Sequence, residues 1–157
     1  MLTGIFAEVH IPEACAQELA SHGWQPEVEA VGDKLVTLKL TAKEARAART
    51  LAREIVGQAG RKSAEAAGHM GESQAIVLAL RPEYRDDILL LDERAARTVA
   101  RERGLTISGF PGVLLLAVQA GLISAESLRH RLERCREQGT HYGREFIEQV
   151  YHMARGV

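Results

Sequence analysis

Several common features are scarce or absent in this 157-residue sequence. Aromatic residues make up only 4%, so aliphatic side chains have to fill the core. The two cysteines stand far apart without a CxxC partner, which excludes a zinc ribbon and a disulfide framework. No apolar run approaches the roughly 18 residues of a membrane span, and the N-terminus lacks the pattern of a secretory signal. We therefore expect a cytoplasmic protein with reduced thiols and no membrane partner.

Familiar ligand-binding motifs are also missing. The formal net charge is -1, so a nucleic-acid contact has to come from a local basic surface. No GxxxxGK[ST] loop is present and no GxGxxG follows a strand, which excludes the usual phosphate-cradling loops. The six histidines form neither HxxxH nor HExxH, and only His69 lies close in sequence to a candidate acid, Glu72.

The sequence does contain alternating strand and helix patterns. Its length predicts one domain over residues 1–157, and the proportions of hydrophobic (46%) and charged (26%) residues are those of a globular protein. Glycines at 57, 60 and 68 predict a flexible connection over residues 58–70. Strands are predicted at 6–11, 35–40, 88–91 and 105–108, and the main helices near 13–20, 42–59, 73–80, 93–103, 111–120, 125–138 and 141–155. This alternation predicts a layered α/β domain with a mostly parallel sheet.

The helix after residue 41 has both an N-terminal signal and a basic face. Thr41 and Glu44 form a T-x-x-E capping box that predicts its first turn. Opposite its apolar stripe the helix carries a basic face of Arg46, Arg49 and Arg53. This face is open to two interpretations, a phosphate-binding surface or a solvated surface partly neutralised by Glu44 and Glu54.

Two carboxylates lie where an α/β sheet places functional groups. Asp92 follows the apolar run Ile88 to Leu91, and function in such sheets gathers at the carboxyl ends of strands. A carboxylate there suits Mg²⁺ or Mn²⁺, but the spacing alone favours Asp92 as the cap of the helix that follows, and one residue can serve as both. Glu72 lies at the start of another helix, where it could bind metal or only interact with the helix dipole.

Four segments in the same order resemble the PIN-domain family. They are GESQAIVLAL, ILLLDERAAR, GLTISGFPG and VLLLAVQAGLI, and the opening IFAEVHIPEACAQEL resembles the second strand and helix of the small prokaryotic branch with a GEAEAI-type motif. The resemblance covers about half of the chain. It implies a three-layer, Rossmann-like α/β/α fold and Mg²⁺- or Mn²⁺-dependent ribonuclease chemistry. It also implies RNA as substrate, often a toxin role with an antitoxin partner, and commonly a homodimer.

Carried over by position, the resemblance assigns catalytic and metal-binding roles to Glu72 and Asp92, with Glu93 as a further metal ligand. Gln74 stands where the branch often has a second glutamate, and its amide oxygen carries no charge to hold a metal strongly. Contact with nucleic acid is expected near the same site from Arg94, Arg97 and Ser108.

The family's first strand, which carries an aspartate in a DTSPL- or DAS-like motif, has no counterpart here. We therefore expect a domain that is N-terminally truncated relative to the family. A start codon assigned too late, a deliberately shortened chain, and a gap closed by rearrangement or by a second chain all remain open.

Two functional classes follow from this pattern. The first is a metal-dependent ribonuclease with weak metal affinity and low activity, because the first aspartate is absent. The second is a non-catalytic PIN-like module that binds nucleic acid or protein. A more distant alternative is an α/β domain whose acids only cap helices.

Overall fold

The computed structural model describes residues 1–58 and 68–156 and divides the chain into two compact units. We call Glu8–Ser108 the strand unit, and Met1–Ala7 together with Gly109–Val157 the helical unit. Most of the flexible connection predicted over residues 58–70 lies outside the described residues. The single domain predicted from chain length stays a prediction.

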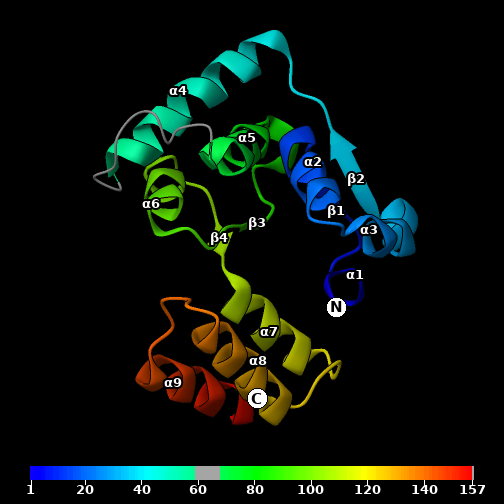
Figure 1. The fold of residues 1–157 in the computed structure, drawn as a ribbon, viewed down its shortest axis with the longest axis vertical. Coiled ribbons are helices and arrows are strands. Elements are labelled where there is room, and N and C mark those ends of the chain that lie inside the picture. The colour runs from blue at the N-terminus through cyan, green and yellow to red at the C-terminus, as the bar shows by residue number, and fades with distance from the viewer. Residues whose placement is uncertain (59–67, 157) are drawn as a thin grey trace. The chain divides into compact units, whose positions relative to one another are not determined.

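The strand unit contains two parallel strand pairs (Figure 1). In the first pair Val9 lies opposite Leu35, and in the second Leu89 lies opposite Ile107. The strands are β1 (Val9–Pro12), β2 (Leu35–Leu38), β3 (Leu89–Leu90) and β4 (Ile107–Ser108). All four predicted strands are present and their pairing is parallel, as predicted. They form two separate two-stranded sheets in place of the one sheet predicted, and within the described residues no strand of one pair bonds to a strand of the other.

Helices complete the strand unit, because two-stranded sheets of this length are not stable alone. The helix α5 is central, since it contacts both β1 and β3 as well as α2, α4 and α6. The helices are α2 (Glu13–Ser21), α3 (Gln25–Val31), α4 (Ala42–Gln58), α5 (Met70–Ala79) and α6 (Arg94–Glu102), with 3₁₀ turns η1 (Gly32–Lys34) and η3 (Pro82–Tyr84). The α3 helix was not predicted from the sequence, and none of its residues is buried.

One apolar core joins α4, α5 and α6. Fully buried Ile55 and Ile76 lie in this core with Val99. The other buried members are Ala48, Leu51, Val77, Leu91, Ala95, Ala96, Ala100 and Leu105. Small alanines on α4 and α6 let the helices approach closely, which explains how a chain with few aromatics still closes its core.

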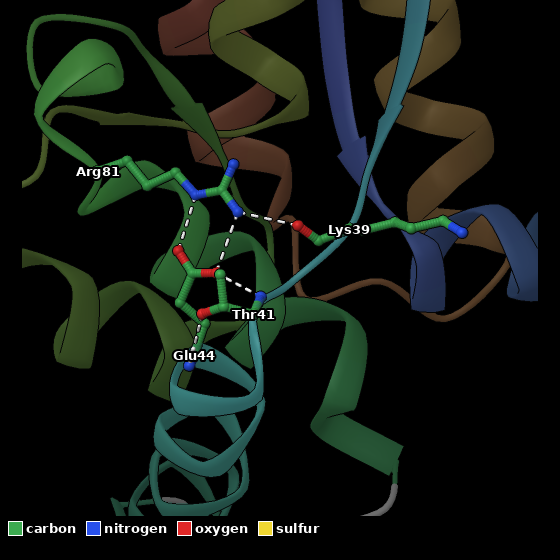
Figure 2. A network of polar contacts seen from close by, with 4 residues as sticks. All are labelled: Lys39, Thr41, Glu44 and Arg81. Carbon is green, nitrogen blue, oxygen red and sulfur yellow. Dashed lines mark hydrogen bonds and ion pairs between the residues drawn. The ribbon is translucent and has the colours of Figure 1, made fainter.

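A polar network joins the start of α4 to the segment after α5 (Figure 2). The capping box is confirmed, since the Glu44 carboxylate accepts from the Thr41 backbone N–H at 2.7 Å and Thr41 Oγ1 accepts from the Glu44 N–H at 3.3 Å. Arg81 donates to both oxygens of Glu44, at 2.8 and 3.0 Å, and to the Lys39 carbonyl at 2.9 Å. These bonds, first that from Arg81 and then that from Thr41, lower the pKa of Glu44 to about 2.

We expect Glu44→Gln to destabilise the protein by about 1–2 kcal/mol at neutral pH, the range for a partly buried, charge-assisted pair. The folded-state pKa is depressed from 4.5 to about 2, so this contribution is present above pH 4.5 and is lost as the pH falls toward 2. Urea unfolding of wild type and variant across this window should show the two stabilities converging at low pH. Glu102→Gln, at an exposed position, is the control, and an equally large gap at pH 2 would contradict the prediction.

The helical unit is built on three helices that the sequence predicts. They are α7 (Phe110–Gln119), α8 (Ala125–Glu137) and α9 (Arg144–Arg155), and a short α1 (Leu2–Ile5) was not predicted. Ser124 caps α8, because its Oγ accepts from the Ser127 N–H at 3.1 Å. Its core consists of Leu114, Leu128, Leu132, Tyr142, Ile147, Val150 and Ala154. Within the described residues, no helix combines the length and apolar character that crossing a membrane requires.

Candidate functional site

The turn between β3 and α6 presents Asp92 to solvent. Leu91 before it is buried, and its N–H donates to the Ser108 carbonyl at 2.9 Å, which continues the β3–β4 ladder. The Leu91 carbonyl accepts from Arg97 Nη1 at 2.6 Å. Asp92 itself is exposed, at the carboxyl end of a strand as predicted.

The helix cap at this turn is Glu93 rather than Asp92. Glu93 Oε2 accepts from the Ala96 N–H at 2.6 Å, which is the N-cap interaction of α6. The alternative in which Asp92 caps this helix is therefore wrong by one residue. One carboxylate oxygen of Glu93, which was also a candidate metal ligand, is already engaged in this bond.

The three predicted nucleic-acid contacts differ in their surroundings. Arg94 is exposed in the first turn of α6. Arg97 is partly buried and holds the Leu91 carbonyl, so it stabilises the turn that presents Asp92. Ser108 ends β4 and is half-buried. All three belong to the β3, β4 and α6 side of the strand unit.

Glu72 lies in the first turn of α5 beside a buried histidine. His69 is the N-cap residue of this helix, and its side chain is only 8% exposed. Its Nδ1 lies 3.9 Å from Glu72 Oε1 and has no hydrogen-bond partner among the described residues. His69, the one histidine close to Glu72 in sequence, thus also lies beside it in the structure, although the distance is too long for a hydrogen bond.

The helix α2 brings two further residues to Glu72 that the sequence reasoning missed. A Cβ atom placed on Gly71 would lie 3.2 Å from both Cys15 Sγ and Glu18 Oε1, so the glycine permits this close approach. Burial, then the negative charges of Glu18 and Glu72, raise the pKa of the Cys15 thiol to about 11. The GES motif itself was the available signal, since a glycine inside a helix often marks close packing.

Gln74 has a structural role in this arrangement. Its Oε1 accepts from the Ala14 N–H at 3.3 Å and thereby satisfies a free donor in the first turn of α2. The amide that replaces the family's second glutamate therefore joins α5 to α2.

Comparison with protein-family models matches residues 1–155 to the family described as a PIN domain (DUF3368). The chain belongs to the PIN-domain family. No curated protein and no solved structure matches it. The resemblance found in the sequence is confirmed, and the helices with their short parallel strands are consistent with a PIN-like α/β/α domain. Membership indicates a nuclease-type function in general, and the family generally acts on RNA.

PIN domains generally use divalent metal ions, so the carboxylates of this PIN domain can be tested as ligands. Glu72 and Asp92 offer oxygen donors of the class that Mg²⁺ and Mn²⁺ prefer. However, no group of three or more His, Cys, Asp or Glu side chains in the described ranges could hold a metal ion. The donors are chemically suitable but too few, so the described residues do not form a complete Mg²⁺ or Mn²⁺ site.

Proposed function

We propose that this PIN domain is a ribonuclease of low activity whose site is centred on Glu72 and Asp92. The observation that carries the proposal is the family match over residues 1–155. Asp92 supports it, because this carboxylate is exposed at the end of β3 and is followed by the exposed Arg94. Arg94, Arg97 and Ser108 are the proposed contacts with the RNA backbone near this acid.

The proposed metal is Mg²⁺ or Mn²⁺, held weakly by Glu72 and Asp92. Glu93 is a third candidate ligand, but its Oε2 already accepts the Ala96 N–H. Full engagement of Glu93 would compete with the cap of α6, whose loss costs about 1 kcal/mol. Weak binding of the metal and slow cleavage of RNA follow from this small donor set.

We expect this chain to hydrolyse single-stranded RNA poorly even with millimolar Mn²⁺. The slow cleavage should disappear on chelation and in Asp92→Ala, and calorimetric Mn²⁺ binding should be lost in both Glu72→Ala and Asp92→Ala. Asp87→Ala, at another exposed acid in the strand unit, is the control and should leave both measurements unchanged. Robust cleavage that is lost in Asp92→Ala would contradict the low activity proposed here.

The second candidate function is a non-catalytic PIN-like module that binds nucleic acid or another protein. It is favoured by the engagement of Glu93 in the α6 cap and of Gln74 in the contact with α2. Absence of both Mn²⁺ binding and cleavage in a folded protein would select this function over the first.

A toxin role in a toxin–antitoxin pair, with an antitoxin protein as partner, belongs to the same proposal. So do a cytoplasmic location, a single domain over residues 1–157 and a homodimer. The helical unit offers exposed apolar side chains for protein association, since Phe146 is 41% and Met153 is 60% exposed on α9. Light scattering after gel filtration would determine the oligomeric state.

A further inference from the structure

The outer face of α4 carries a stripe of arginines. Arg46, Arg49 and Arg53 are all exposed and lie at positions i, i+3 and i+7 of the helix. Seven residues correspond to about 10 Å along a helix axis. The buried residues of α4 face the core and are Ala48, Leu51, Ala52, Ile55 and Val56. The stripe therefore lies on the side of α4 that is turned away from α5 and α6.

The acids that could neutralise this stripe are engaged elsewhere. Glu44 is held by Arg81, with oxygen–nitrogen distances of 2.8 and 3.0 Å. Glu54 is held by Arg103 in the same two-pronged way, at 2.7 and 3.1 Å. Each acid thus joins α4 to a neighbouring segment of the strand unit. Glu44 and Glu54 therefore do not pair with the arginines of the stripe, as one interpretation of the sequence had them do.

The three guanidinium groups consequently remain available. Within residues 1–58 and 68–156 the guanidinium groups of Arg46, Arg49 and Arg53 form no ion pair and no hydrogen bond, and Arg46 takes part only through its backbone carbonyl, which accepts from Thr50 Oγ1 at 3.4 Å. Lys43, one turn earlier and also exposed, extends the same positive surface. Four cations over about three turns of helix make a local basic surface on a chain whose formal net charge is -1.

We propose that the arginine stripe of α4 binds the phosphate backbone of single-stranded RNA. A guanidinium group presents paired N–H donors that match the oxygens of a phosphate. A protein partner is disfavoured, because the exposed positions between the arginines are Ala47 and Thr50, which supply no large apolar side chain for the centre of an interface. The helix α4 has no aromatic residue on which a base could stack, so the proposed contacts are to phosphate, which carries no sequence information.

The stripe is a binding surface separate from the acidic site. It lies on α4, whereas Glu72 is on α5 and Asp92 precedes α6, and α4 packs against both helices. The choice of RNA as the bound polyanion rests on the proposed ribonuclease function. The basic surface itself is observed in the structure and does not depend on that function. RNA bound along α4 would remain on the strand unit even where the metal site is weak.

The test is fluorescence anisotropy of a labelled oligouridine of about 15 nucleotides, a length that spans a typical single-strand site. The full chain is used in EDTA, so that cleavage and metal binding do not contribute. We expect the triple variant Arg46→Gln, Arg49→Gln, Arg53→Gln to bind about tenfold more weakly at low salt. The slope of log K against log salt should decrease in magnitude by about 2, since each single-strand phosphate contact contributes about 0.7.

The matched control removes three charges from exposed arginines elsewhere. Arg85→Gln, Arg134→Gln and Arg144→Gln give the same change in net charge. This control should keep the wild-type slope, with circular dichroism verifying that both triple variants are folded. The proposal is overturned if the stripe variant binds like wild type, if the control loses as much, or if oligoglutamate binds the stripe more tightly than oligouridine. If RNA binding depends on the stripe but the protein cleaves no RNA, the ribonuclease proposal is contradicted and the proposal of an RNA-binding stripe is supported.

Discussion

Replacing Ile76 with alanine is expected to lower the free energy of unfolding by about 3–4 kcal/mol, within the range for a buried isoleucine. Ile76 is fully buried on α5, in the core that also contains Ile55 and Val99. The truncation removes three methyl or methylene groups from a site enclosed by α4 and α6, and these helices cannot collapse fully into the space. Chemical unfolding followed by circular dichroism would measure the loss.

Ile88→Ala is the matched control, because this isoleucine of the strand unit is 43% exposed. It should change stability by no more than about 0.5 kcal/mol, as is usual at a surface position. Equal effects of the two alanine substitutions would contradict the packing described for α5. Since α5 also carries Glu72, Ile76→Ala should weaken any Mn²⁺ binding as the helix loses its support.

Leu128→Ala should have a similarly large effect, about 3 kcal/mol, on the helical unit. Leu128 is fully buried on α8 and packs with Leu132 and Ile147. A loss of this size corresponds to about 6–12 °C in the melting temperature of a chain of this length. Leu122→Ala, at a leucine that is 46% exposed, is the control and should cost much less.

The two core variants together test the single domain that the chain length predicts. If the strand unit and the helical unit unfold as one, Ile76→Ala and Leu128→Ala should each shift one common transition. Two separate transitions, each sensitive to only one substitution, would contradict the prediction. All of the candidate site residues lie in the strand unit, so independent units would let Leu128→Ala leave RNA binding unchanged.

Local features of the fold could be predicted well from the sequence. The capping box at Thr41 and the predicted end of α6 before Gly104 are both confirmed, and Gly104 has the positive φ of +73° expected after a helix. These signals involve residues within a few positions of one another. The α3 helix was missed because a short exposed helix has no apolar stripe to reveal it.

The acids of the candidate site were harder to interpret. Asp is a preferred cap residue and Glu is not, so the sequence favoured Asp92, and only the backbone geometry determines that Glu93 accepts the Ala96 N–H. Gln74 could be recognised as a substitution for an acid, but its bond to the Ala14 N–H spans 60 residues. The Cys15 and Glu18 side chains near Gly71 likewise come from a distant helix.

The sequence by itself determined the α/β class, most of the helices, the positions of the four strands and the PIN-domain family, because periodicity, capping and short motifs are properties of neighbouring residues. Only the tertiary structure decided which charges are paired. Glu44 pairs with Arg81, 37 residues away, and Glu54 pairs with Arg103, 49 residues away. The exposed arginines of α4 are therefore not paired with these acids. Such pairs depend on how the helices pack in space. Sequence spacing reveals pairs three or four residues apart on one helix, but not pairs between distant segments.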